Sequence, residues 1–261
     1  MTDLWYNVGM DMEKITAMRE GGKILGEILA ELRDYVDVGM TEREVDKWVR
    51  KKIESRGASC SYDELEEKFP GCICISVNDE LVHGAPNNDY AFEDGDKVSF
   101  DLVIKYKGYH TDAAFTKVVG HGNPAVKQMV KTTEEALWAG IDQVAPGVHL
   151  GDIGFAVERV LRKDKLGVIE NYIGHGIGKE MHMAPEVPNY GKRGKGYILK
   201  PGDCICIEPM SSLGKPYNHV DKEDGWSVIL SDGSIGCHCE HTILVTEDGH
   251  EVLTLPNCPR N

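Results

Sequence analysis

The feature that most constrains this chain is a faint internal repeat. Residues 95–101 (GDKVSFD) match residues 202–208 (GDCICIE), because each has Gly-Asp, an alternating strand pattern and then a carboxylate. Residues 38–40 (VGM), leading into a helical pattern, match residues 146–148 (PGV) at nearly the same offset. The repeat predicts a chain of two similar halves that share one site.

A third match, at a shorter offset, supports this interpretation. Residues 83–86 (HGAP) are echoed by residues 182–185 (HMAP). Three matches in the same order predict halves of roughly 12–120 and 121–250, each with two helices and a few antiparallel strands. Such halves bring four polar side chains to opposite sides of the shared site: Asp101 with Glu208, and His83 with His182.

Hydrophobic periodicity predicts the elements of an α+β fold. Apolar residues at helical spacing predict helices over 12–34, 41–56, 124–143 and 150–163. Alternating or continuous apolar runs predict strands over 71–78, 97–107, 203–208, 227–231 and 241–246. Thr41 followed by Glu44 is a capping-box pattern. No Pro- or Ser-rich linker divides the chain, so we expect one compact unit.

Composition narrows the class of protein. The formal net charge of -14 argues against a nucleic-acid or anionic-membrane partner. The charge has two interpretations, namely solubility or carboxylates gathered at a metal site. The N-terminus lacks the basic start and apolar run of a signal peptide, so we expect a cytoplasmic protein with eight reduced cysteines. Six of these form Cys-x-Cys pairs, which we interpret as side chains packing along strands.

Four carboxylates lie next to apolar strands. Asp101 follows an apolar run, and Asp112 comes after a turn-like Lys-Gly, a spacing that suits facing carboxylates on one hairpin. Glu208 ends a second apolar run, and Glu240 precedes a third. A buried carboxylate needs a partner. Any one of the four could be a salt bridge or a strand end, but together they indicate a metal site.

His175 completes the candidate ligand set. It lies in residues 173–178 (IGHGIG), where glycines on both sides allow close backbone approach. A glycine-flanked histidine alone is more often a turn residue than a ligand. Combined with four carboxylates, it suits manganese, iron, cobalt or zinc.

These motifs resemble those of the methionine aminopeptidases. The likeness runs from about residue 10 to residue 253, and its motifs agree in order and spacing. They are residues 76–86 (SVNDELVHGAP), Asp101 with Asp112, 174–178 (GHGIG), His182, 207–210 (IEPM) and 240–242 (EHT). The resemblance implies the pita-bread fold and one catalytic domain over residues 1–261. Only 26 residues separate His182 from Glu208, which matches the short bacterial type I form.

The resemblance also implies roles for individual residues around two divalent ions (Co, Mn, Fe or Zn). Asp101 would chelate one ion, while His175 and Glu208 hold the other. Asp112 and Glu240 would bridge the two ions. Glu208 would also be the general base. The resemblance implies that His83 and His182 position the peptide and stabilise its developing negative charge.

A pocket for a methionine side chain should be apolar, with aromatic walls. The resemblance places six residues around it: Cys60, Tyr62, Phe69, Cys74, Met181 and Trp226. Residues 63–68 form a charged stretch where many relatives have a short turn containing glycine and an aromatic residue. For each pocket residue, the alternative is ordinary core packing.

The resemblance implies N-terminal methionyl peptides and nascent chains as substrates, with a small second residue. Transient ribosome association is open, and the type I form is usually monomeric. Two alternatives remain. An X-Pro aminopeptidase or prolidase shares the fold and the metal set but usually carries a large extra N-terminal domain. A non-catalytic binding protein on the same fold typically lacks metal ligands, whereas all five ligand types stand here.

Overall fold

The four predicted helices are confirmed in a computed structural model that describes residues 11–86 and 89–256. Their bounds are α1 Met12–Tyr35, α2 Glu42–Ser55, α3 Pro124–Ile141 and α4 Leu150–Lys163. Asp11 caps α1 by accepting from the Lys14 amide at 3.1 Å. Thr41 and Glu44 form the expected capping box at the start of α2. These side chains satisfy amides that the first helical turn leaves unpaired.

A nine-stranded sheet forms the centre of the molecule. Its main path runs β1 (Ser59–Cys60), β4 (Lys97–Tyr106), β5 (Tyr109–Val118), β14 (Glu240–Val245), β9 (Cys204–Ile207), β7 (Gly174–Gly176) and β8 (Met183–Val187). At its sides, β2 (Cys74–Val77) pairs with β4, and β15 (His250–Val252) pairs with β14. Both copies of the repeated segment, in β4 and β9, therefore belong to one sheet.

Two three-stranded sheets complete the fold. One is β13 (Gly236–His238), β10 (Met210–Ser212) and β6 (Gly167–Val168). The other is β11 (Asn218–Val220), β12 (Val228–Leu230) and β3 (Glu80–Val82). A short 3-10 helix, Ser61–Glu64, lies between β1 and β2. Of these short strands, only β12 lies within a predicted strand, residues 227–231. The others lack the length that periodicity needs, and the sequence did not predict them.

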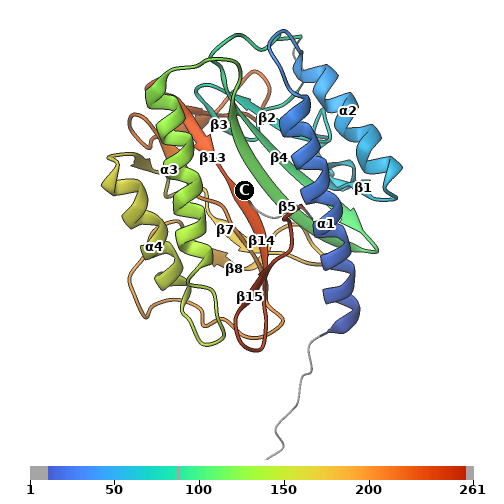
Figure 1. The fold of residues 1–261 in the computed structure, drawn as a ribbon, viewed down its shortest axis with the longest axis vertical. Coiled ribbons are helices and arrows are strands. Elements are labelled where there is room, and N and C mark those ends of the chain that lie inside the picture. The colour runs from blue at the N-terminus through green and yellow to red at the C-terminus, as the bar shows by residue number, and fades with distance from the viewer. Residues whose placement is uncertain (1–10, 87–88, 257–261) are drawn as a thin grey trace, which may run out of the picture.

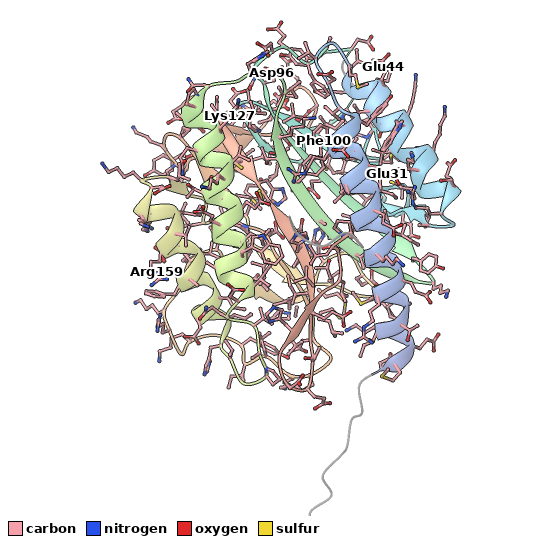
Figure 2. The ribbon with its side chains drawn as sticks, in the orientation of Figure 1. Glu31, Glu44, Asp96, Phe100, Lys127 and Arg159 are labelled. Atoms are coloured by element: carbon pink, nitrogen blue, oxygen red, sulfur yellow. The ribbon has the colours of Figure 1, made fainter. Side chains whose placement is uncertain are left out.

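The helices lie in two pairs over one face of the central sheet, α1 with α2 and α3 with α4 (Figure 1). Each pair buries its apolar face in its own core. Leu25 and Ile28 of α1 pack in one cluster with Phe100 of β4, and Leu137 and Ile153 of α3 and α4 pack in another. Figure 2 shows charged side chains such as Arg159 on the outside of the helices. The opposite face of the sheet is not covered by these helices, and the candidate site lies there.

The seven cysteines among the described residues all carry free thiols, as the sequence predicted. Within the same ranges, no helix combines the length and the apolar character needed to span a bilayer. Residues 1–10, from which the absence of a signal peptide was inferred, lie outside the described part of the chain.

Candidate metal centre

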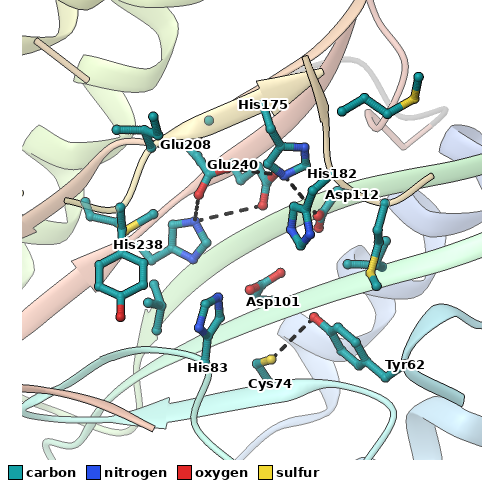
Figure 3. Close-up of a pocket in the computed structure, with 18 of the residues that line it drawn as sticks. Tyr62, Cys74, His83, Asp101, Asp112, His175, His182, Glu208, His238 and Glu240 are labelled. Carbon is teal, nitrogen blue, oxygen red and sulfur yellow. Dashed lines mark hydrogen bonds and ion pairs between the residues drawn. The ribbon is translucent and has the colours of Figure 1, made fainter. Parts of the chain in front are cut away.

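Five neighbouring strands of the central sheet each contribute one predicted ligand. In sheet order, these are β4, β5, β14, β9 and β7. They carry Asp101, Asp112, Glu240, Glu208 (directly after β9) and His175. The five side chains converge on one pocket (Figure 3). Residues that are far apart in the sequence are thus brought together by strand order alone.

Strand register explains how the carboxylates fit side by side. Asp101 pairs with Ala114 and Asp112 pairs with Val103, so the predicted hairpin is confirmed, with the two carboxylates diagonal rather than directly opposite. Glu240 pairs with Ala114 from the other side. The small side chain of Ala114 therefore lies between two acids, where a larger one would occupy the space between them.

Glycines let the His175 strand approach its neighbours closely. A Cβ on Gly174 would lie 2.2 Å from the Cys206 carbonyl oxygen, and one on Gly176 would lie 2.2 Å from the Ala184 carbonyl oxygen. The ring Nδ1 of His175 donates to the Gly176 carbonyl at 3.0 Å. Its Nε2 lies 3.4 Å from Glu208 Oε1 and 3.8 Å from Asp112 Oδ2. This arrangement leaves the Nε2 lone pair for a cation.

The burial of the carboxylates calls for partners of opposite charge. Asp101, Asp112, Glu208 and Glu240 are each at most 8% exposed. Asp101 Oδ1, Asp112 Oδ1 and Glu240 Oε1 have no hydrogen-bond partner among the described residues. Burial raises the pKa of all four, and for Asp112, Glu208 and Glu240 neighbouring carboxylates raise it further. Orphaned acidic oxygens beside a neutral imidazole fit divalent cations.

Cys206 is a member of the cluster that was not predicted from the sequence. Possible ligand atoms of Asp112, His175, Glu240 and Cys206 all lie within 4.8 Å of one another. Cys206 lies in β9, two residues before Glu208, and this spacing gives both side chains the same face. Burial raises the pKa of this thiol well above its usual value, so it stays neutral without a metal. The i, i+2 spacing was the signal that could have identified it.

Three further histidines surround the carboxylates. His182 lies with its ring centroid 4.4 Å from that of His175, and burial lowers its pKa. His83 has a left-handed backbone, with φ of 59°, and its ring packs against Tyr172 at 5.7 Å. Burial and the nearby His182 lower the pKa of His83 to about 4. His238, which was not predicted from the sequence, lies 3.8 Å from Glu208 and 3.9 Å from Glu240.

A cavity of about 620 Å³ opens onto these groups. Five of the six predicted pocket residues line it: Tyr62, Phe69, Cys74, Met181 and Trp226. The ring of Phe69 packs at a tilt against that of Tyr62, with centroids 4.9 Å apart, and meets Trp226 edge-on at 5.4 Å. The Cys74 thiol donates to the Tyr62 hydroxyl at 3.3 Å. Aromatic and sulfur-containing walls thus end at the cluster of acids.

Cys60 is a correction to the predicted pocket. It is not among the residues that line the cavity, and its thiol donates instead to the Cys72 carbonyl at 3.5 Å. Two acids of the neighbouring charged stretch form ion pairs outside the cavity lining. Arg50 binds Asp63 at 2.8 Å, and Lys105 binds Glu64 at 2.7 Å. Tyr62 and Leu65 still reach the cavity.

The fold and the buried acidic cluster define a metallopeptidase. The profile of metallopeptidase family M24 matches residues 16–247. A curated relative, methionine aminopeptidase 1 of Bacillus subtilis, is 38% identical over 91% of this chain and 94% of its own length. The chain therefore belongs to metallopeptidase family M24, among the methionine aminopeptidases.

Solved structures agree with this assignment. The crystal structure of methionine aminopeptidase from Rickettsia prowazekii matches with a TM-score of 0.91 and 34% identity, over 95% of this chain and 99% of that one. Prolidase from Pyrococcus furiosus also matches, with a TM-score of 0.75 and 25% identity, but only 66% of its length is covered. The predicted two-halved pita-bread fold is confirmed by these neighbours.

Proposed function

We propose that this chain is a metal-dependent aminopeptidase that removes the initiator methionine from peptides and nascent proteins whose second residue is small. The observation that carries this proposal is one cavity with aromatic and sulfur-containing walls that ends at buried acids. A flexible, polarizable methionine side chain fits such walls. The peptide bond that follows the methionine would then lie against the acids and histidines.

Two divalent ions of manganese, iron, cobalt or zinc fit the acidic cluster. Asp101 would hold one ion, His175 and Glu208 the other, and Asp112 and Glu240 would bridge them. The three orphaned oxygens and the free Nε2 of His175 support this ligand set. When bound, such ions polarise a carbonyl and lower the pKa of water.

The chain's own residues supply the proton transfers and the orientation of the peptide. Glu208 would act as the general base, because a carboxylate with a raised pKa can take a proton and pass it to the leaving amine. Its backbone is held by Asn189, whose side-chain amide donates to the Glu208 carbonyl at 3.0 Å. His83 and His182 would donate to the peptide carbonyl oxygen as negative charge develops.

Specificity at the second residue would come from crowding. His83 and His182 line the same cavity as the acids, so a second residue would lie between these histidines and the metal ions. Small residues such as Ala, Gly, Ser and Thr should therefore be accepted, whereas Lys and Phe should not. We further infer a monomeric cytoplasmic enzyme, with transient ribosome association as an open question.

The turnover of Met-Ala-Ser against an Ala-Pro dipeptide tests this function. We expect chelation to abolish release of methionine, and added Mn²⁺, Co²⁺ or Fe²⁺ to restore it. Preferred cleavage of the Ala-Pro dipeptide would instead assign a proline-specific peptidase. Full activity in excess chelator, with no metal found by mass analysis, would exclude the metal-dependent mechanism.

The number of ions can be tested at the bridging position. Replacing Glu240 with Ala should remove both ions, because one carboxylate would serve two sites. Metal per chain is measured by elemental mass spectrometry, with the exposed Glu66→Ala variant as the control. A Glu240→Ala protein that retains one tightly bound ion would show that Glu240 is not a bridge.

A further inference from the structure

His238 is a buried histidine for which the proposed function has no role. Its side chain is 2% exposed, and it lies at the end of β13, two residues before Glu240. Thr116 of β5 fixes its backbone: the His238 amide donates to Thr116 Oγ1 at 3.3 Å, and the Thr116 hydroxyl donates to the His238 carbonyl at 2.6 Å. The backbone that carries the ring is therefore held in place by β5.

The surroundings of the ring are unusual for a buried polar side chain. Neither ring nitrogen has a hydrogen-bond partner among the described residues. Nε2 lies 3.8 Å from Glu208 Oε2 and 3.9 Å from Glu240 Oε2 (Figure 3). A buried side chain with unpaired donors and acceptors is costly, so a partner is expected at this point of the site.

A comparison with His175 distinguishes a ligand from a donor. In His175, a backbone carbonyl occupies Nδ1, which leaves Nε2 as an acceptor for a cation. In His238, no such carbonyl among the described residues fixes the tautomer, and the groups that Nε2 faces are two hydrogen-bond acceptors. A nitrogen between two carboxylate oxygens is best satisfied by carrying a proton and donating it.

We propose that His238 is a positioning residue of the metal centre, whose Nε2–H donates a hydrogen bond to the carboxylate of Glu208 or of Glu240. A donor on one oxygen of a carboxylate fixes which oxygen remains for the ion. Small rotations of the two carboxylates, as they turn toward bound ions, would bring one of these oxygens within hydrogen-bond distance. This inference rests on the proposed ligand set, since it assigns the residue that orients one of those ligands.

Two substitutions of His238 test whether its role is to donate a hydrogen bond. In His238→Gln, the side-chain amide places an N–H donor near the position of Nε2. In His238→Leu, a side chain of similar size carries no donor. Mn²⁺ affinity is measured by titration calorimetry on metal-stripped protein. We expect the Leu variant to bind roughly 10–100-fold more weakly than the original chain, as for other partners of metal ligands, and the Gln variant to bind nearly as tightly as the original.

The outcomes decide between alternatives. Equal loss in the Gln and Leu variants would mean that the imidazole itself is needed, as a ligand, and would overturn the proposal. Unchanged affinity in the Leu variant would overturn it as well. Thermal unfolding of the metal-free proteins checks folding, and His238→Met replaces the Leu variant if that protein is unfolded. If the original chain itself binds no Mn²⁺, the failure lies with the proposed function rather than with His238.

Discussion

At the scale of single residues, one backbone carbonyl determines what His175 can do. Because Nδ1 donates to the Gly176 carbonyl at 3.0 Å, Nε2 faces the acids with a lone pair. Burial and the nearby His182 lower the pKa of His175 to about 4, which keeps this lone pair free at neutral pH. The flanking glycines provide this geometry, since any Cβ there would collide with a neighbouring strand.

The role proposed for His182 gives a prediction at the same scale. The His182→Ala variant should keep its metal but lose turnover by about 10²–10³-fold, the loss expected for one donor to a developing oxyanion. Turnover of Met-Ala-Ser and metal per chain are measured on the same sample. The exposed His121→Ala variant is the control. Loss of metal together with activity would show that His182 is needed for metal binding.

How far single residues could be predicted from sequence depended on their context. Acids beside apolar runs stand out, because burial of a charge demands a partner. His238 and Cys206 did not stand out, since each lies in a short strand and a lone histidine or cysteine there is usually core. Cys60 was misplaced because sequence cannot show which way a thiol points.

At the scale of elements, the hairpin before His83 depends on a buried lysine. Lys97 of β4 is fully buried, and its ammonium donates to the Ser76 carbonyl at 3.0 Å and the Glu80 carbonyl at 2.8 Å. These carbonyls belong to the end of β2 and the start of β3, the strand that leads into His83. Lys97 therefore fixes a segment that carries a residue of the site.

Replacing Lys97 with Met should remove both hydrogen bonds that the ammonium donates to backbone carbonyls. We expect a loss of about 2 kcal/mol in the free energy of unfolding, at roughly 1.5–3 kcal/mol for each hydrogen bond from a charged donor less the relief of burying a charge. Turnover should fall while metal content stays unchanged. Urea unfolding and turnover are compared with the exposed Lys23→Met variant. Unchanged stability would contradict a structural role for the buried ammonium.

Long elements were predictable from periodicity, with the exception of β5, which only the hairpin spacing of Asp101 and Asp112 indicated. The four helices and strand β4 span several turns or alternations, so periodicity identified them close to their observed bounds. Strands of two or three residues, such as β6, β7 and β13, carry too few positions for a period to show. Their pairing depends on distant strands, which no local pattern reveals.

At the scale of the whole molecule, the two predicted halves each supply part of the proposed ligand set. Asp101 and Asp112 come from the first half, and His175, Glu208 and Glu240 from the second. The internal repeat predicted this meeting of halves, because matching strands ending in a carboxylate occur in both. What it could not predict was the order of five strands across the sheet, which sets the spacing of the ligands.

The gathered acids predict a pH-dependent stabilisation by metal. Burial raises the pKa of Asp101 from 3.8 to about 7, and those of Asp112, Glu208 and Glu240 are also raised. In metal-free protein, a raised carboxyl pKa gives stability that is present below the unfolded value and is lost as pH rises through the folded value. Bound cations favour the ionised acids. The stabilisation of the folded protein by metal should therefore grow as pH rises between the unfolded and the folded carboxyl pKa values.

The difference in Tm between metal-loaded and metal-free protein should therefore increase from pH 5 to pH 8. Each tenfold change in the proton affinity of a carboxyl group corresponds to about 1.4 kcal/mol, so we expect an increase of about 5 °C or more. Scanning calorimetry at saturating Mn²⁺ or in chelator provides the two values. Groups away from the metal centre titrate alike in both samples, so their contributions cancel in this difference in Tm. A difference that is constant or falls with pH would contradict ionised acids at the metal.

The most direct test of the central claim is a panel of metal-loaded digestions read by mass spectrometry. The peptides vary only at positions one and two. We predict release of methionine from peptides that begin Met-Ala, Met-Gly, Met-Ser and Met-Thr, and none from Met-Lys or Met-Phe, with every cleavage lost in chelator. Faster release of Ala or Leu than of Met, or cleavage that requires proline at position two, would contradict the assignment.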